Sequence, residues 1–377
     1  MRIRALGALN QQNSFNLNAL RLTIEKDKDS SKFPAGFRAD IAYGTDAAKL
    51  NGGVLAAGAA TAATSENAVS IEQAYVDFGI PLGNGIDAKF GKMSSLLGYE
   101  VINSRANWQF SRSDAFRLLP LAQEGLTLGY QWNDYFNSTV GLINGYDHSA
   151  LFNNTAAGGA SGASNLNTSL SFVGRMDIAA YKSKYGDVSG YLAGYYGNDN
   201  SNATALDNST SLSVLDVGVT WQKAFGYKHL TLASEFVERI DSGITTGAAA
   251  AASSSASADA FSLYGAWAWN KQYTTSGRFS HTFYNQSNNA ALSTQSLSPF
   301  ASQFTGGLAQ NSNNTVSSFT LTQAVNVWKD TLMRLEWRHD WTDIGSDVGT
   351  GFSGTSGNSL DARQSQDTIA VNIVYSF

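Results

Sequence analysis

Hydrophobic and polar residues alternate with a period of two along most of the chain. Successive side chains of a β-strand point to opposite faces, so this alternation predicts strands with one apolar face and one polar face. The pattern is clearest over residues 37–43, 74–80, 126–132, 215–221, 333–339 and 369–377.

Each alternating segment is about ten residues long, the length of a tilted strand that crosses a membrane. Following the pattern along the whole chain predicts about sixteen strands. Their expected first residues are Arg2, Phe15, Gly36, Val69, Ile86, Glu124, Phe136, Asn167, Asp187, Thr210, His229, Ala260, Tyr273, Thr315, Thr331 and Gln366.

The connections between these strands alternate in length. Short ones lie at residues 81–85, 133–134, 182–186, 270–272 and 328–330, and long ones at 46–68, 94–122, 146–166, 198–209, 241–259, 285–314 and 342–365. This order predicts an all-β chain whose residues 1–377 form one transmembrane antiparallel up-and-down β-barrel. Its short turns and both termini are expected at the periplasmic rim, and its long loops outside the cell. A β-sandwich would not sort its connections in this way, and a solenoid would show a fixed repeat.

Aromatic residues gather at both ends of the expected strands, as amphipathic rings do at the two interfaces of a membrane. Phe377 closes the last alternating strand, which is typical of outer-membrane barrels. We therefore expect a bacterial outer-membrane location, with lipid and lipopolysaccharide as partners. The rings beside short connections are Trp132, Tyr135, Trp221, Tyr227, Trp269, Tyr273 and Trp328, and those at the opposite ends are Tyr43, Tyr146, Tyr196, Phe283 and Trp341.

Composition excludes several other classes of protein. The chain of 377 residues has a net charge of -5 and no cysteine. Without a basic region, nucleic acid is not an expected partner. No run of about twenty apolar residues is present, which excludes a transmembrane helix. The first residues, Met1 to Leu6, already have the pattern of a strand, so we expect that a signal peptide has been removed.

The region from Ile71 to Asp147 resembles the OmpL-like β-barrel porin family. The resemblance covers about a fifth of the chain directly, and the remainder agrees in pattern. It implies a porin-like barrel and assigns no functional residue. The matching stretches are Glu72–Asp77, Lys89–Lys92, Leu97–Glu100, Ser111–Ser113 and Asn144–Asp147.

Charges of both signs occupy the polar positions of the expected strands. A charge that faces hydrocarbon is costly, so we expect these side chains to face the lumen. About sixteen strands enclose more space than side chains fill, which favours a water-filled channel over a salt-bridged, closed lumen. The expected lumen charges are Arg21, Arg38, Asp40, Asp77, Asp87, Lys89, Arg175, Asp177, Asp216, Glu235, Arg278, Arg334, Glu336, Arg338 and Asp340.

Four of these charges form a ladder on one strand, at Arg334, Glu336, Arg338 and Asp340. Charges of alternating sign on one wall can produce a transverse field in a pore. They can equally well neutralise one another. The sequence leaves both interpretations open.

The long connection at residues 94–122 is the candidate constriction loop. A long early loop can fold into the lumen of a barrel and narrow it; an external cap or a subunit contact is the alternative. Its three arginines outnumber its two acids, so we expect a mild preference for anions. The candidate residues are Glu100, Arg105, Arg112, Asp114 and Arg117.

Catalysis has little support in the sequence. Of the four histidines, His281 follows Ser280 on one strand, which places the two side chains on opposite faces. No His, Cys and carboxylate cluster has the spacing of a transition-metal site. Asp199 lies in an Asn-rich loop, which explains it as well as a calcium site would. We expect no enzyme activity, no metal and no cofactor.

Two classes of function remain. The first is a porin for passive diffusion of small hydrophilic solutes or ions. The second is a structural or partner-bound barrel, such as a sheath around another protein or an adhesion platform. A homotrimer is also expected, since small residues at Gly190, Gly194, Gly265 and Ala268 would allow close approach of a second copy.

Overall fold

The computed structural model describes residues 15–29, 33–44, 46–47, 69–145, 170–198, 211–244, 254–286, 314–342 and 365–377. They form fifteen strands. The strands are β1 (Leu20–Lys26), β2 (Ala35–Tyr43), β3 (Val69–Ile80), β4 (Ile86–Ser94), β5 (Ala122–Asn133), β6 (Phe136–Ile143), β7 (Ser171–Ser183), β8 (Gly186–Asn198), β9 (Ser211–Gln222), β10 (Leu230–Ile244), β11 (Ser254–Ala268), β12 (Tyr273–Gln286), β13 (Asn314–Trp328), β14 (Thr331–Thr342) and β15 (Ser365–Tyr375).

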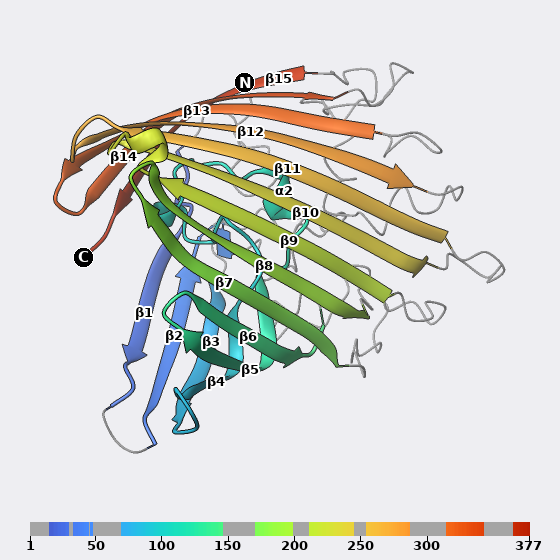
Figure 1. Ribbon diagram of the computed structural model, residues 1–377. Helices are drawn as coiled ribbons and strands as arrows, with labels where there is room; N and C mark the ends of the chain where they lie inside the picture. The colour runs from blue at the N-terminus through green and yellow to red at the C-terminus, as the bar shows by residue number, and fades with distance from the viewer. Residues whose placement is uncertain are drawn as a thin grey trace.

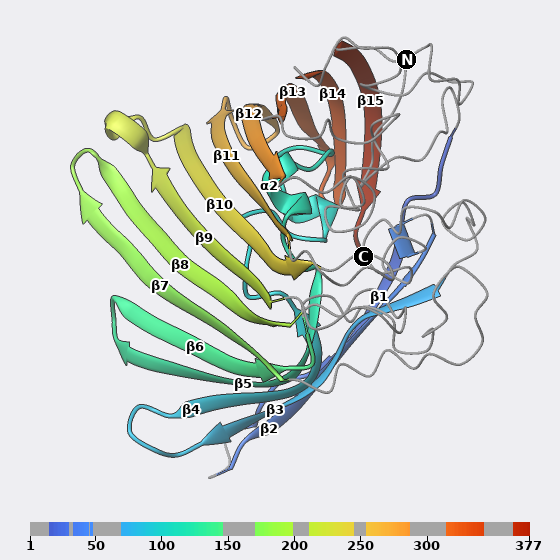
Figure 2. The same ribbon diagram turned by 90° about the vertical axis from the view of Figure 1, so that its right-hand side faces the viewer.

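All fifteen strands belong to one sheet, in which each strand pairs with its neighbours in the sequence. The pairing is antiparallel throughout, and β1 and β15 are the two edges of the described sheet. The sheet curls around the segment that joins β4 to β5 (Figures 1 and 2). This up-and-down order confirms the predicted architecture. The strand expected at Arg2 lies outside the described residues.

The strand positions agree closely with the alternation pattern. The expected starts at Val69, Ile86 and Phe136 coincide with those of β3, β4 and β6. The largest difference is at β11, which begins at Ser254 rather than at Ala260. Residues 254–259 were expected to be a loop because they are small and polar. They extend β11 because backbone pairing with β10 requires no large apolar side chain.

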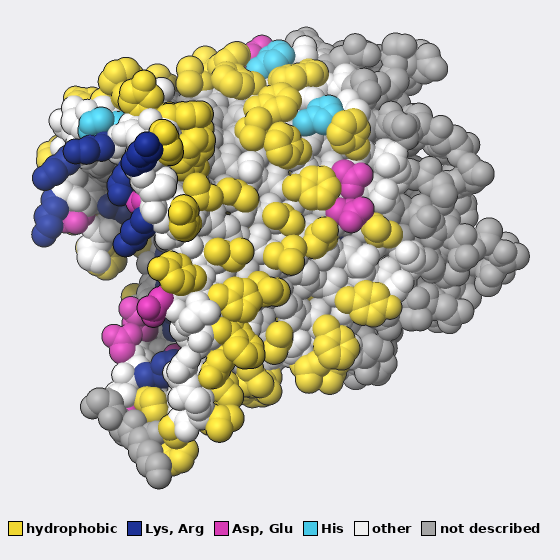
Figure 3. Space-filling view, in the orientation of Figure 1, with side chains coloured by type: hydrophobic (Ala, Val, Ile, Leu, Met, Phe, Trp, Pro, Cys, Tyr) yellow, Lys and Arg dark blue, Asp and Glu magenta, His cyan; other side chains and the backbone are white. Residues whose placement is uncertain are grey.

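The two faces of the sheet are inverted relative to a water-soluble protein. On β14, the side chains of Leu335 and Trp337 are exposed on the outer face, whereas Arg334, Glu336 and Arg338 are buried on the inner face. Hydrophobic side chains spread over the outer surface (Figure 3). An apolar outer surface of this kind is stable in contact with lipid. Charges on that surface would be costly, and they lie on the inner face instead. No helix in the described part of the chain is long and apolar enough to cross a membrane.

Candidate pore constriction

The segment between β4 and β5 folds against the concave face of the sheet. It contains η1 (Ser104–Ala106) and α2 (Asp114–Arg117), and α2 lies inside the curve of the strands (Figures 1 and 2). Ser113 starts α2, because its Oγ accepts a hydrogen bond from the N–H of Phe116 at 3.1 Å. Residues 95–121 are called the inner loop below. They belong to the predicted constriction segment, 94–122.

Two buried carboxylates hold the start of the inner loop. The N–H of Gly98 donates to Oδ2 of Asp216 on β9 at 2.5 Å. The next N–H, of Tyr99, donates to Oε1 of Glu235 on β10 at 2.7 Å. Gly98 has a φ of +107°, which glycine adopts without steric cost. These two hydrogen bonds fix the start of the loop to the wall.

Two tyrosines complete this anchor. The hydroxyl of Tyr191 on β8 donates to Oδ1 of Asp216 at 3.1 Å and lies 3.3 Å from Oε1 of Glu235. The hydroxyl of Tyr264 on β11 donates to Oε2 of Glu235 at 3.2 Å. Tyr191 fits because its cross-strand neighbour is Gly218, where a Cβ would lie 2.1 Å from the ring. The carboxylates therefore have hydrogen-bond donors from both the wall and the loop.

Arg175 on β7 adds a contact from the adjacent strand. Its Nη1 donates to the backbone oxygen of Leu96 at 2.8 Å, and its Nε donates to Oδ1 of Asp177 at 2.8 Å. The guanidinium lies 3.8 Å from the centre of the Tyr191 ring, in the geometry of a cation–π contact. Arg175 thus extends the anchored region of the wall from β9 and β10 to β7.

An ion pair holds the middle of the inner loop. Nη1 of Arg278 on β12 lies 2.7 Å from Oε1 of Glu100, and the two side chains are 0% and 2% exposed. The same nitrogen donates to the backbone oxygen of Ser111 at 2.8 Å. The other oxygen of Glu100 accepts from the N–H of Ser113 at 2.6 Å. A buried pair with these additional hydrogen bonds is costly to break from one side.

The first two charges of the β14 ladder, Arg334 and Glu336, bind the backbone of the inner loop. Nη2 of Arg334 donates to the backbone oxygen of Ser104 at 2.7 Å. Glu336 accepts from the N–H of Phe110 at 2.6 Å and from the N–H of Ser111 at 3.0 Å. These are the charges expected to face the lumen, and the loop covers them. They therefore contact protein rather than water.

The last two charges of the ladder, Arg338 and Asp340, lie beside the same loop. Nη1 of Arg338 donates to the backbone oxygen of Arg112 at 2.6 Å, and its Nε donates to Oδ1 of Asp340 at 2.7 Å. Nη2 of Arg338 lies 3.6 Å from Oδ1 of Asp114 at the start of α2. The four charges of β14 therefore bind the inner loop or one another. They do not face open water, as a transverse field in the pore would require.

The candidate arginines of the inner loop have different surroundings. Arg112 is buried and donates to two backbone carbonyl groups of the loop itself. Arg117 is buried 3.9 Å from Asp114. Burial disfavours the charged guanidinium and lowers the pKa of both. Arg105 is only partly buried, and its Nη1 donates to the backbone oxygen of Asp330 at 3.3 Å. The expected positive charge at the water interface is therefore reduced to Arg105.

The wall formed by β1–β4 keeps some of its charges nearer to water, although Asp40 and Glu72 are buried. Arg38 and Glu25 pair at 3.1 Å with side chains 36% and 53% exposed. Nζ of Lys89 lies 5.3 Å from the centre of the Tyr75 ring, and Lys89 is opposite Asp77 in the strand register. The ion pairs of this wall are Arg21–Glu72, Lys28–Asp77, Lys28–Asp87, Arg38–Glu25 and Arg38–Asp40.

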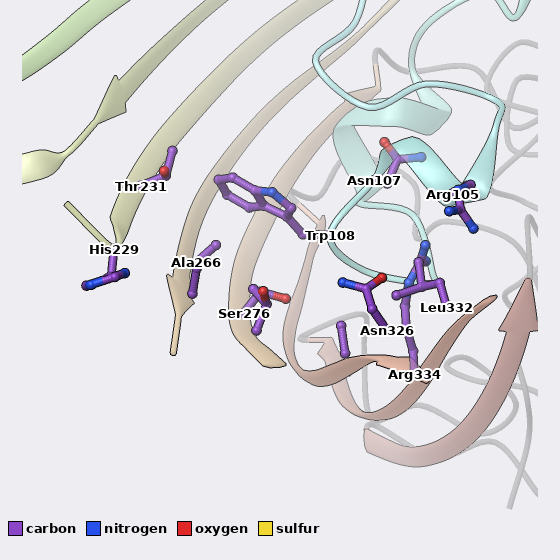
Figure 4. Close-up of a pocket in the computed structure, with 13 residues that line it drawn as sticks. Arg105, Asn107, Trp108, His229, Thr231, Ala266, Ser276, Asn326, Leu332 and Arg334 are labelled. Carbon is purple, nitrogen blue, oxygen red and sulfur yellow. The ribbon is translucent and has the colours of Figure 1, made fainter. Parts of the chain in front are cut away.

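A cavity of about 270 Å³ lies between the inner loop and the ends of β10–β14 that carry the short turns. The loop contributes Arg105 and Trp108, and the strands contribute His229, Ser276 and Arg334. In Figure 4, Trp108 points from the loop toward the strands. The cavity is partly open.

Sequence reasoning missed several residues of this site. Tyr191, Tyr264 and Gly218 bind or accommodate the anchor, yet they lack charge and were not singled out. The available signal was position, because both tyrosines occupy inward positions in mid-strand rather than at a rim. Ser280 and His281 do point to opposite faces, and Nδ1 of His281 lies 2.7 Å from Oγ of Ser317.

Residues 5–377 match the family described as "Putative beta-barrel porin-2, OmpL-like". This match spans nearly the whole chain and agrees with the inward charges and the up-and-down sheet. The chain belongs to this porin family. It is therefore an outer-membrane channel protein. A comparison with curated proteins found no match.

Solved structures show the same fold for this porin. The outer-membrane channel DcaP of Acinetobacter baumannii has a TM-score of 0.53 at 12% identity, covering 94% of this chain and 84% of that one. The anion-selective porin of Comamonas acidovorans has a TM-score of 0.53 at 13% identity, covering 95% and 89%. OmpT of Vibrio cholerae in its trimer form has a TM-score of 0.51 at 9% identity, covering 97% and 91%. At these identities the similarity concerns the fold.

Among the residues that the structure describes, no group of three or more His, Cys, Asp or Glu side chains could hold a metal ion. The charges of the site instead pair with one another or with the loop backbone. The arrangement positions a segment of chain inside the sheet.

Proposed function

We propose that this porin passes small hydrophilic solutes by passive diffusion and that the inner loop forms its narrowest part. The observation that carries the proposal is the docking of the loop backbone onto the inward charges of β9, β10, β12 and β14. A loop held by buried charged groups keeps one shape, and a constriction requires this. Loops that only cap a barrel need no such contacts.

The remaining passage lies between the inner loop and the β1–β4 wall. That wall carries both signs of charge in pairs that are partly exposed. Paired charges largely cancel at a distance, so the channel has a weak preference between anions and cations. Arg105 tips this balance toward anions, while Arg112 and Arg117 contribute less because they are buried.

The alternative of a sheath around another protein has less support. A protein partner in the lumen would compete with the inner loop for the concave face of β9–β14. The inner loop already occupies that face and uses its charged groups, including Glu336 and Arg338. A diffusing solute needs only the space that the loop leaves.

We further propose a homotrimer in a membrane that contains lipopolysaccharide. A porin of the same fold exists in a trimer form. Gly190, Gly194 and Gly265 share the outer face with exposed neighbours such as Leu192 and Leu263. Ala268 does not belong to this face, because it lines the internal cavity. A mass measurement in mild detergent tests the assembly, and a monomeric mass would contradict it.

A single introduced cysteine tests the constriction, because the natural chain has none. Val101 on the inner loop is 44% exposed. In Val101→Cys, a positively charged methanethiosulfonate reagent should lower single-channel conductance in planar bilayers. The matched control is Leu335→Cys, which faces lipid and should show no change. Absence of any channel would overturn the diffusion function, and an unchanged conductance in Val101→Cys would overturn the constriction.

A further inference from the structure

The cavity beside the inner loop lies on the periplasmic side of the constriction. Five strands, β10 to β14, line it with residues close to their short turns. A solute that passes the loop therefore meets this cavity on the same side of the barrel as the periplasm.

The cavity carries positive charge without a lining carboxylate. The guanidinium groups of Arg105 and Arg334 and the imidazole of His229 line it, and no Asp or Glu is among its lining residues. Arg334 binds a hydroxyl and backbone oxygens rather than an acid, such as the oxygen of Ser104 at 2.7 Å. Glu336 follows on the same face and offsets part of this charge, but its carboxylate accepts from backbone N–H groups. Arg105 remains the accessible cation.

A flat apolar surface lies beside these cations. Trp108 points into the cavity, toward Thr231 and Ala266 in Figure 4. Its ring makes edge contacts with the rings of Tyr99 and Tyr264, at centroid distances of 6.3 and 6.5 Å. These contacts hold the indole in place. A second flat group can therefore pack against it without ordering the side chain first.

An unpaired hydroxyl group provides a further indication of a ligand. Ser276 lines the cavity, is only 2% exposed, and its Oγ has no hydrogen-bond partner. Buried polar groups normally have a partner, because an unpaired one costs free energy. Rotation of this side chain toward the cavity would let a polar atom of a bound solute satisfy it.

The short turns between β7 and β14, at the same end of the sheet as the cavity, are also basic. The turns at 184–185, 223–229, 269–272 and 329–330 contain five lysines and one aspartate. Such a rim raises the local concentration of anions at the periplasmic mouth. The lysines are Lys184, Lys223, Lys228, Lys271 and Lys329.

We propose that this cavity is a binding site for small organic anions that combine a carboxylate with a flat apolar ring. The carboxylate pairs with Arg105, and the ring packs on Trp108. The cavity volume of about 270 Å³ suits a solute that is smaller than a typical drug molecule. The inference rests on the proposed function, since the solute reaches the cavity through the lumen.

Three probes separate the two parts of this recognition. Benzoate has the charge and the ring, acetate has only the charge, and benzamide has only the ring. Added to the short-turn side of a planar bilayer, benzoate should interrupt the single-channel current. Acetate and benzamide should require roughly tenfold higher concentrations or more, because each lacks one contact. Equal effects of all three probes would overturn the proposal.

Substitutions assign the effect to the cavity. Trp108→Leu and Arg105→Gln should each weaken the benzoate block by roughly tenfold, which corresponds to one lost contact. Trp108→Phe keeps a flat ring and Arg105→Lys keeps the charge, so both should retain most of it. If the Leu and Gln variants block like wild type, the site lies elsewhere and the proposal fails.

The same recordings distinguish the two proposals. A conducting channel that benzoate never interrupts overturns the binding site and leaves diffusion through the porin intact. Protein that inserts without conducting overturns the proposed function itself. Because wild-type protein alone gives both results, a variant that fails to fold does not decide the outcome.

Discussion

The β9–β14 wall and the β1–β4 wall of this porin both carry charges on their inner faces, but they use them in different ways. On β12, Arg278 is fully buried against Glu100 of the inner loop. On β2, Arg38 pairs with Glu25 on the neighbouring strand, and both remain partly exposed. The first wall is a docking surface for a loop, and the second borders the passage that we propose.

The strand pattern alone does not decide what an inward charge does. Desolvation makes a buried ion pair sensitive to the loss of either partner, at a cost of about 3–5 kcal/mol. An exposed pair of the same composition contributes about 0–1 kcal/mol. The inner loop contributes to this difference, because it covers Arg278 while Arg38 and Glu25 remain partly exposed.

The largest expected effect comes from breaking the buried pair. Arg278→Met leaves Glu100 buried without its cation and should weaken loop docking by about 3–5 kcal/mol. The barrel should persist, while the loop should become accessible to protease and the conductance should rise and fluctuate. Single-channel recording and limited proteolysis measure these changes.

Arg38→Met is the matched control on the other wall. It removes an arginine that is itself partly exposed, as is its partner Glu25, and its buried partner Asp40 keeps the hydrogen bond from Gln73, so loop protection should stay near that of wild type. Equal proteolysis of the two variants would remove the distinction between the walls.

A smaller effect is expected from crowding the anchor. Gly218→Ala places a Cβ 2.1 Å from the Tyr191 ring, which must move away from Asp216 and Glu235. Overpacking of this kind costs about 1–3 kcal/mol. In Gly174→Ala, the new Cβ would lie 3.8 Å from its nearest neighbour, so this variant should behave like wild type. Thermal unfolding followed by heat-dependent gel mobility compares the pair.

Selectivity should respond to the exposed wall by a modest amount. Lys89→Gln should shift the permeability ratio toward cations, and Asp77→Asn, opposite in the register, should shift it toward anions. Each shift should be smaller than about twofold at 0.15 M salt and should grow as dilution lengthens the screening distance. Reversal potentials in salt gradients give the ratio. Shifts of the same sign in both variants would contradict a passage bordered by this wall.

The smallest effect concerns pH. Burial raises the pKa of Tyr99 to about 12, although its hydrogen bond with Thr220 opposes the shift. The ordinary value is about 10, so the docked loop holds this proton more tightly than a released loop. The contribution to docking is thus complete below about pH 10 and is lost as pH rises toward 12.

Tyr99→Phe removes this titration. At neutral pH its conductance should match that of wild type, because Tyr99 is uncharged there. As pH rises from 10 to 12, the loop of the variant should stay docked, and so protected from a cross-linking reagent, up to a higher pH than that of wild type. An identical alkaline transition in both proteins would assign the change to other tyrosines.

Much of the fold was predictable because strand geometry is a local property. On β14, Leu335 and Trp337 face lipid while Arg334 and Glu336 face inward, as the alternation requires. The alternation of short and long connections was also visible in the sequence, because only one rim of an up-and-down barrel has tight turns. The start of β11 was not predicted, because small polar residues such as Ser257 occur both in loops and in paired strands.

The site was predictable only in part. The sequence selected the inner loop and the inward charges, including Arg278 and Glu100, but no local rule pairs residues that are 178 positions apart. It also treated Arg112 and Arg117 as equivalent to Arg105. Only the folded loop distinguishes them, because its own carbonyl groups and Asp114 surround the first two.

The sequence by itself determined the class of this protein, because the period of two, the charges on one face of the strands and the alternation of short and long connections agree together with an up-and-down barrel in lipid. The tertiary structure decided which charges still face water. Burial depends on what covers a side chain, and the inner loop covers β9–β14 while leaving Arg38 and Lys89 on the opposite wall partly exposed. The same placement brings Trp108 and Arg105 to strand ends that lie far from them in the sequence.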